Sequence, residues 1–444
     1  MVTKLTNCRL GCLTAILALV LICGGASDLS AVEVNPSPAQ PEVADFSYKL
    51  GIGGFMRGEG AGNFLLKDFS SAPGASEGRV LYRVKPYAYW HPTDYLDIHA
   101  EGQGYGLDGG QSSFHRASLY QGFAEARLPQ SDRASLKVGR QDFTYGSTFI
   151  LGPDSFFDGL SFDALRLRLK PLDTVTIDLF GGYYARPFSG GISGELAGIY
   201  NTVTFSEGTA LEAYAILDGG TTVRHTGEKL YNFGLRGTAV LGPVALEFEP
   251  VYQSGDLFSE SLGRNVPVNA YGGHADAVIT APVGGYQTKL QLGYAYGSGD
   301  KGAVAGGSAG REFRNPNNDS CVVGDMSMIA DLSGLTVRDT HASGLQIYTL
   351  GWGVDLSRDL NVSATSRYFY ANEAPEGVSR QIGLETDFSL TYAVNNDLSV
   401  LLGYDHFFTG RFFRDAAGRS NDADYGYLMF QFNLSRQKLK GKKG

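Results

Sequence analysis

Hydrophobic and polar residues alternate one by one along nearly the whole chain. The stretch 425–434 shows this most clearly, because one side carries the apolar residues Leu428, Phe430, Phe432 and Leu434. The other side carries Tyr427, Met429, Gln431 and Asn433. A period of two residues predicts β-strands. Its recurrence over hundreds of residues is typical of a transmembrane β-barrel, with lipid outside and water inside.

The alternation, together with the turn residues that interrupt it, predicts eighteen antiparallel strands in one barrel. These strands are expected to begin near Phe46, Arg79, Tyr95, Arg116, Arg133, Phe162, Thr174, Glu195, Ala210, Leu230, Val244, Asn269, Tyr286, Gly344, Leu360, Ser379, Leu398 and Asp424. The number is even, as expected when both ends of a bacterial barrel chain lie on the periplasmic side.

Two kinds of connection alternate between the expected strands. The tight kind is rich in Pro, Gly, Asn and Asp, as turns require, and occurs at 91–94, 129–132, 171–173, 206–209, 242–243, 282–285, 357–359 and 395–397. The other kind is longer and more polar, with the longest example running from Ser298 to Ser343. Short periplasmic turns and long outer loops are the asymmetry of an outer-membrane barrel. A large soluble array of β-sandwiches is the alternative fold.

The N-terminus predicts export to the outer membrane of a Gram-negative-type cell. Lys4 and Arg9 precede an apolar core, and Gly24-Gly-Ala26 offers small residues for signal cleavage. We expect residues 1–26 to form the signal peptide and 27–45 a flexible periplasmic lead-in. The barrel is expected to span 46–434, followed by a basic periplasmic tail at 435–444. No apolar run of 18 residues follows the signal, which excludes a helical membrane protein.

Composition and charge narrow the choice of partner. The chain has 60 Gly, 25 Tyr and 26 Phe, and only 19% of its residues are charged, which suits β structure. Its net charge is −9. Loss of Lys4 and Arg9 with the signal would make it −11, so we expect no nucleic-acid partner. Cys321 is the one cysteine outside the expected signal, so we expect no internal disulfide.

The alternation also predicts which charged residues face the lumen. The inward basic residues are expected to be Arg79, Arg83, Lys85, Arg127, Arg166, Arg168, Arg236, Lys289 and Arg367. The inward acids are expected to include Asp97, Glu101, Glu125, Asp178, Glu247, Glu249, Glu385 and Asp387. Arg140 shares the parity of the lipid-facing Leu136 and Val138. Either a bulge at Gly139 turns it into the lumen, or the strand has already left the membrane at this position; we favour the bulge. A charge facing lipid at mid-depth would cost on the order of 2–4 kcal/mol.

Basic side chains lining a pore favour anions, and facing carboxylates tune their field. Arginine in particular can bind two oxygens of a carboxylate or phosphate. Individual pairs could instead brace the barrel wall. Taken together, we interpret them as an anion-handling constriction.

The segments Gly139-Arg-Gln-Asp-Phe-Thr-Tyr-Gly146 and Ser161-Phe-Asp-Ala-Leu-Arg166 resemble the alginate export family of outer-membrane porins. The resemblance extends over most of the mature chain through the strand count. It implies an eighteen-stranded barrel whose arginine-rich pore passes a uronate polysaccharide out of the periplasm, with Arg140 and Arg166 bordering the pore. The sequence differs from the family pattern at Leu160 and Ala164. The turn Asn395-Asn-Asp397 also stands where the best-known exporter is expected to have a long flap.

We therefore predict a porin for anionic solute, with export of an alginate-like polyuronate as the leading function. Outer-membrane lipid, the anionic polysaccharide or sugar acid, and periplasmic export machinery are its expected partners. A general or sugar-acid uptake porin is the alternative. A barrel-embedded hydrolase is the third hypothesis and would need a serine beside a histidine on neighbouring strands. No cofactor is expected. The seven histidines show no metal-ligand spacing, so no metal is expected either.

Overall fold

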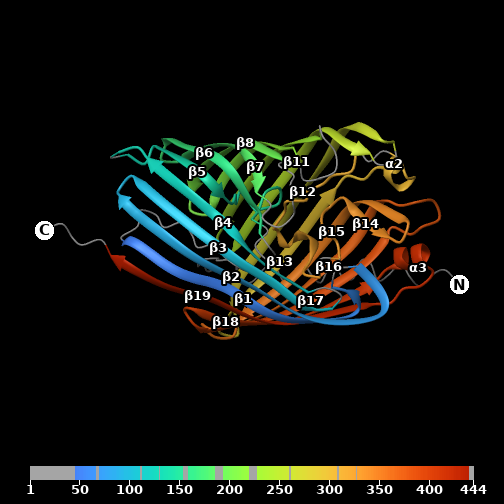
Figure 1. Cartoon of the computed structure of the whole chain (residues 1–444). Coiled ribbons are helices and arrows are strands. Elements are labelled where there is room, and N and C mark those ends of the chain that lie inside the picture. Colours follow the sequence, from blue (N-terminus) through green and yellow to red (C-terminus); the bar gives the residue numbers. More distant parts are fainter. Residues whose placement is uncertain are drawn as a thin grey trace.

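The computed structural model describes residues 46–66, 70–110, 113–129, 131–153, 159–185, 194–219, 228–259, 262–307, 310–326 and 328–439. This part of the chain forms a closed antiparallel β-barrel of 18 strands (Figure 1). Consecutive strands pair as hairpins around the ring, and β1 pairs with β19 to close it. The predicted fold class and strand number are confirmed.

The first wall strands are β1 (Phe46–Leu65), β2 (Ser70–Thr93), β3 (Leu96–Gly109), β4 (Phe114–Arg127), β5 (Ala134–Gln141), β6 (Ser161–Leu172), β7 (Val175–Ala185), β8 (Glu195–Ser206) and β9 (Thr209–Gly219). The ring continues with β10 (Lys229–Leu241), β11 (Val244–Ser259), β12 (Arg264–Val283), β13 (Tyr286–Gly297), β15 (Thr340–Asp355), β16 (Leu360–Glu373), β17 (Gln381–Asn395), β18 (Leu398–Thr409) and β19 (Ala423–Leu439). The short β14 (Gly334–Val337) pairs with the first residues of β15, beside the ring.

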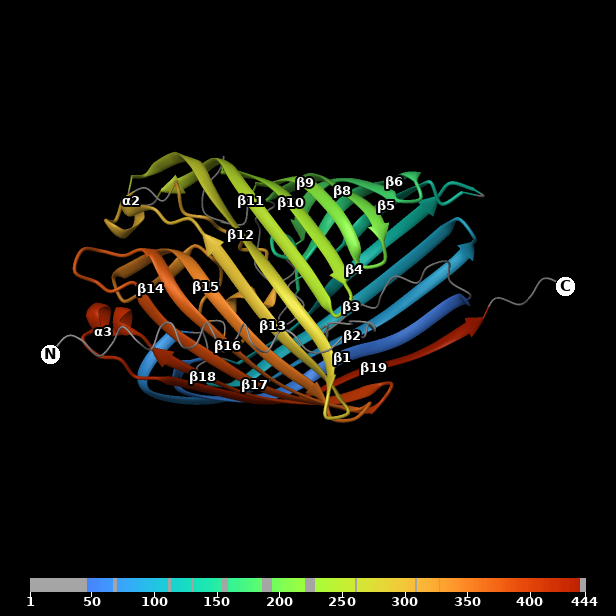
Figure 2. The ribbon, with the colours of Figure 1, turned by 180° about the vertical axis from the view of Figure 1, so that it is seen from behind.

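In the described part of the long connections lie two short helices and one 3₁₀ turn. They are α2 (Lys301–Val304), η1 (Cys321–Val323) and α3 (Arg411–Ala417). Among the described residues, no helix has the length and apolar character needed to span a bilayer. Figures 1 and 2 show α2, α3 and β14 at one end of the molecule, with β19 finishing at the other. The predicted tight turns fall at the end where β19 finishes.

Several strands begin earlier than predicted. β2 begins at Ser70 rather than near Arg79, and β12 begins at Arg264 rather than near Asn269. The composition of the first residues of β2 predicts a loop, because these residues are rich in Ser, Gly and Pro. It nevertheless continues the ladder with β1, where Leu65 pairs with Ser70 and Gly62 pairs with Ser76. Partner strands can therefore hold a segment extended where its own composition favours a turn.

The end of the barrel also differs from the predicted boundary. β19 runs to Leu439, so the first residues of the expected tail continue the strand. They do so because Ser435 pairs with Gly51 and Leu439 pairs with Phe46 on β1. The predicted signal peptide and lead-in, and the remaining tail 440–444, lie outside the described residues.

The two faces of the wall follow the predicted alternation. On β2, Val80 and Trp90 are 47% and 54% exposed, whereas Arg83 is 1% exposed and faces the lumen. Some wall positions are glycines covered by a cross-strand aromatic ring. A Cβ on Gly234 would lie 2.0 Å from the ring of Tyr214. Glycine at such a position lets the ring lie flat along the wall.

Candidate pore constriction

After β5 the chain leaves the wall and folds into the barrel. We call residues 142–153 the first inward loop. Phe143 in this loop packs on Phe162 and Phe180, with ring centroids 5.3 and 4.8 Å apart. Tyr145 stacks on Tyr200 of β8 at 4.6 Å. These aromatic contacts hold the loop against the inner face of β6–β8.

Tyr145 adds a polar anchor to the same packing. Its hydroxyl donates a hydrogen bond to Asp178 of β7 at 3.1 Å. Burial, and then the negative charge of Asp178, raise the pKa of Tyr145. The hydroxyl therefore remains protonated and keeps its role as donor.

The connection between β13 and β15 supplies the second inward loop, which we define as residues 310–326 and 328–333. Its Phe313 stacks on Phe149 of the first inward loop at 5.9 Å. Asn315 donates its side-chain amide to the Phe149 carbonyl at 3.1 Å and accepts the Leu332 N–H at 3.0 Å. The two loops therefore form one hydrogen-bonded unit.

Backbone bonds reinforce this junction. Gly152 N–H donates to the Asn317 carbonyl at 2.9 Å, and Asp319 N–H donates to the Thr148 carbonyl at 3.0 Å. We call the two joined loops the constriction, because they occupy space inside the wall where an open barrel would hold water.

The constriction is attached to well-separated parts of the wall. The Asn317 amide donates to Tyr184 of β7 at 2.6 Å and to Asp218 of β9 at 3.2 Å. At its other end, the Asp325 N–H donates to Glu385 of β17 at 2.8 Å. The constriction therefore reaches from β7–β9 to β17.

A strip of basic side chains faces the lumen on β2–β6, and we call it the basic strip: Arg83, Lys85, Arg127, Lys137, Arg166 and Arg168. The sequence predicted all of these except Lys137, which is 1% exposed. The alternation on β5 does predict an inward side chain for Lys137, because Lys137 lies between the outward Leu136 and Val138.

Each member of the basic strip has a partner on the wall. Lys85 lies 3.2 Å from Glu101, and Arg127 pairs with Asp97. Arg168 binds Asp178 through two hydrogen bonds of 2.7 Å. Arg166 and Lys137 share Glu125 at 3.4 and 3.7 Å. Arg83 donates to Gln103 at 3.0 Å and lies over the Tyr120 ring. Ion pairs that can brace the wall are therefore present at five members of the strip, namely Lys85, Arg127, Lys137, Arg166 and Arg168.

Acidic side chains gather on the remaining inner wall. On β9–β12, Arg236 lies 2.8 Å from both Glu212 and Glu247. On β16–β18, Arg367 pairs with Asp387, and Glu385 and Asp405 are each 1% exposed. Lys289, predicted to line the lumen, lies on β13 with Gln287 and Gln291.

Arg140 does not join the basic strip, and the predicted bulge at Gly139 is wrong. The ladders of β5 with β4 and β6 continue in register through Gly139. Alternation therefore leaves Arg140 on the outer face with Val138. There it binds Asp163 of β6 through two hydrogen bonds of 2.8 and 2.9 Å. This bidentate partner balances the charge of the guanidinium on the outer face.

The outward ion pair gives a first prediction. Arg140→Leu should lower the free energy of unfolding by about 1.5–3 kcal/mol, because it removes hydrogen bonds between charged groups and leaves Asp163 alone on the lipid face. Adding Asp163→Leu should recover most of this loss, since an apolar pair suits lipid. Urea unfolding of the parent, both single variants and the double variant in lipid vesicles measures the coupling. A coupling near zero would contradict the assignment of this pair to the membrane face.

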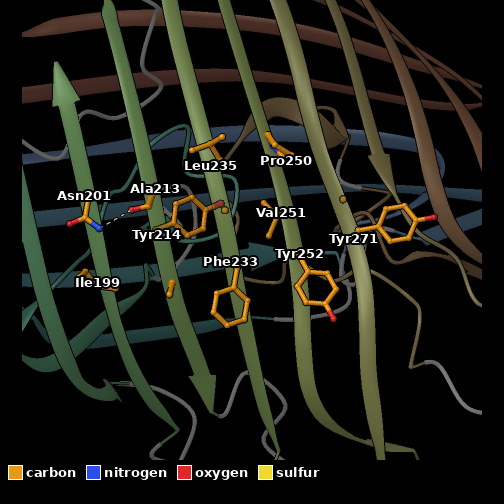
Figure 3. A pocket seen from close by; sticks show the side chains of 13 residues that line it. Ile199, Asn201, Ala213, Tyr214, Phe233, Leu235, Pro250, Val251, Tyr252 and Tyr271 are labelled. Atoms are coloured by element: carbon orange, nitrogen blue, oxygen red, sulfur yellow. Dashed lines mark hydrogen bonds between the residues drawn. The ribbon is translucent and has the colours of Figure 1, made fainter. Parts of the chain in front are cut away.

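A hollow of about 680 Å³ lies on the outside of the barrel rather than in the pore. Figure 3 shows Phe233, Tyr252 and Tyr271 around it, on β10, β11 and β12. These side chains are 46%, 45% and 57% exposed and occupy outward-facing positions of their strands. The hollow therefore belongs to the lipid-facing surface.

One group in the lumen has the composition of a metal site. Ligand atoms of Glu247, Glu249 and His274 lie within 4.8 Å of one another. The sequence did not predict this group because 25 positions separate Glu249 from His274, and only the pairing of β11 with β12 joins them.

Comparison with known proteins assigns the family. The model of the family described as alginate export matches residues 87–322. The chain belongs to the alginate export family. This confirms the resemblance seen in the sequence. No curated protein sequence matches the chain.

Solved structures share the fold of this family member. OccAB1 of Acinetobacter baumannii has a TM-score of 0.59 at 11% identity, covering 87% of this chain and 96% of its own. OccD3 (OpdP) of Pseudomonas aeruginosa has a TM-score of 0.59 at 11% identity, and the match covers 91% of this chain and 97% of OccD3. OccK11 (OpdR) of Pseudomonas aeruginosa has a TM-score of 0.56 at 14% identity, and the match covers 87% of this chain and 96% of OccK11. Family and fold together identify an outer-membrane porin.

Proposed function

We propose that this porin conducts acidic saccharides, and that an alginate-like polyuronate moving out of the cell is its substrate. The observation that carries this proposal is the basic strip. Its side chains lie on β2, β4, β5 and β6. A carboxylated chain would therefore meet successive cations as it passes. Periplasmic export machinery would deliver the polymer at the tight-turn end of the barrel.

The pairing of the strip with carboxylates supports passage rather than tight binding. An incoming uronate must compete with Glu101 for Lys85 and with Glu125 for Arg166. Each ion pair that the uronate forms therefore replaces an ion pair that the wall already makes. Conduction requires this kind of weak, repeated site. The wall carboxylates also hold the cations in fixed positions along the path.

A second candidate is a pore for short sugar acids. The hydrogen-bonded constriction favours it, because the two inward loops narrow the lumen that a polymer would have to thread. The turn between β17 and β18 is also short, at Asn395 to Leu398. Chain length of the solute therefore separates the two candidates, while both use the basic strip.

The structure places a serine beside a histidine, as the hydrolase alternative requires. The serine hydroxyl, however, donates its proton to a carboxylate and not to the imidazole. Ser147 Oγ lies 3.1 Å from His274 Nε2 and 2.5 Å from Glu249 Oε2. An ionised carboxylate can only accept, so the serine proton lies toward Glu249. The imidazole is then not placed to remove that proton, as a general base must. We propose that the porin is not an enzyme.

Ion selectivity tests the proposed function. The parent protein in planar bilayers should prefer anions, and Arg166→Gln with Arg168→Gln should reduce that preference by lowering the positive charge along the path. Arg133→Gln is the matched control, because Arg133 pairs with Asp173 in an exposed turn. Cation selectivity of the parent would contradict the proposal.

Added uronates then separate the two candidates. Polyuronate should block the anion current of the parent if the polymer enters the pore. Block by a monouronate alone would assign the channel to short sugar acids. Reversal-potential measurements with each uronate as the main anion give the direct comparison.

A further inference from the structure

A square of polar side chains lies on β11 and β12, away from the basic strip. The ladder pairs Glu247 with Asp276 and Glu249 with His274. Residues two positions apart on a strand share a face, so all four side chains point into the lumen. Glu249 and His274 are 2% and 8% exposed. The square is therefore a fixed product of strand register.

Three atoms of the square converge at distances suited to one metal ion. His274 Nε2 lies 3.6 Å from Glu249 Oε2 and 4.0 Å from Glu247 Oε1. In a tetrahedral site with metal–ligand bonds of about 2.0–2.2 Å, two ligand atoms lie roughly 3.3–3.6 Å apart. All three ligand atoms lie within 4.8 Å of one another, so they must draw closer together to surround an ion.

The fourth member of the square orients the imidazole. Asp276 Oδ2 lies 2.7 Å from His274 Nδ1, and Phe149 packs on the same ring at 4.9 Å. A carboxylate that accepts from one ring nitrogen directs the other nitrogen toward the metal, as in known metal centres. Nε2 is the nitrogen directed at Glu247 and Glu249 here.

The first inward loop reaches this position through Ser147. Its hydroxyl is within hydrogen-bond distance of both His274 Nε2 and Glu249 Oε2. An ion held by Glu247, Glu249 and His274 would therefore lie beside the loop. Ser147 or a water molecule can complete its coordination, which would fasten the constriction to β11 and β12.

The surrounding charge favours a cation. Four carboxylates, on Glu212, Glu247, Glu249 and Asp276, lie around Arg236 and His274. Arg236 is 2.8 Å from Glu212 and Glu247, and 3.9 Å from Glu249. Even with a protonated imidazole, the carboxylates exceed the positive groups. A divalent ion would offset this remaining negative charge.

We propose that Glu247, Glu249 and His274 bind a divalent transition-metal ion of the Zn²⁺ class in the lumen. One imidazole nitrogen with carboxylate oxygens suits Zn²⁺, whereas Ca²⁺ and Mg²⁺ prefer oxygen ligands alone. This site is independent of the anion pathway proposed for the basic strip.

Calorimetric titration of the untagged, folded barrel in detergent with ZnCl₂ tests the site. The parent should show one saturable site for Zn²⁺ and much weaker binding of CaCl₂. His274→Ala and Glu249→Gln should each abolish it. Asp276→Asn should weaken it by about 10–100-fold, because only the orientation of His274 is lost. Arg236→Gln should tighten it, since a competing positive charge is removed.

His115→Ala is the matched histidine control, because His115 has an exposed side chain and pairs with Asp108. It should leave Zn²⁺ affinity unchanged. Circular dichroism confirms that each variant is folded. If His274→Ala fails to fold, the other two variants test the site. Asp276→Asn should lower the affinity for Zn²⁺ and Arg236→Gln should raise it. Absence of saturable Zn²⁺ binding, or equal binding by the parent and Glu249→Gln, would overturn the proposal.

Discussion

Replacement of Arg367 by methionine is expected to lower the free energy of unfolding of the barrel by about 3–5 kcal/mol. Arg367 is 5% exposed and pairs with Asp387, which is equally buried. Glu385 and Asp405 lie at the neighbouring inward positions of β17 and β18. Methionine fills similar volume but supplies no charge. The cost therefore comes from buried carboxylates that lose their guanidinium.

Equilibrium unfolding in urea, followed by the fluorescence of Trp90 and Trp352, measures this effect. Arg133→Met is the matched control, since Arg133 lies 2.9 Å from Asp173 with both side chains exposed. Its expected cost is about 0–1 kcal/mol. Adding Asp387→Leu to Arg367→Met should restore part of the stability, because the unpaired carboxylate is removed. Equal losses for Arg367→Met and Arg133→Met would contradict the role assigned to Arg367.

Asn315→Leu should open the constriction. The substitution keeps the size of the side chain but leaves the Phe149 carbonyl and the Leu332 N–H without their hydrogen bonds to it. Each buried polar group that loses its partner costs about 1–3 kcal/mol. The joined state of the two inward loops should therefore be much less populated. Single-channel recordings should show a higher mean conductance with frequent transitions between levels.

Asn201→Leu provides the control for this experiment. Asn201 lies on the outward face of β8 and donates to the Ala213 carbonyl at 3.3 Å. The same chemical change there should leave conductance unchanged, because no part of the constriction is touched. If Asn315→Leu conducts like the parent, the junction between the loops does not control the width of the pore.

The alternation of residue types was sufficient to predict the wall and most of its inward charges. A shift of one residue would move every side chain of a strand to the other face, so the pattern fixes parity strictly. Alternation alone places Arg83 and Arg367 in the lumen, and for Arg166 it agrees with the family resemblance. The predicted lumen position of Arg140 is wrong because it requires a bulge that is absent, whereas Asp163 supplies a counter-charge on the outer face.

The constriction and the His274 group could not be predicted in the same way. A loop has no period that reports whether it folds inward or outward, so Phe149 and Asn315 carried no signal of their position. The group around His274 depends on the register between β11 and β12, which sets Glu249 opposite His274. The residues next to Glu249 and His274 in the sequence do not reveal that register.

Closure by β1 and β19 has a consequence for assembly. Every other ladder of the wall joins wall strands that follow one another in the chain, so each can form as a local hairpin. The seam instead pairs Phe46 with Leu439, across almost the whole described chain. Until β19 pairs with β1, the wall is an open sheet with two unpaired edges, each able to pair with another chain. Pairing of the last strand with the first is therefore the step that converts an aggregation-prone sheet into a ring.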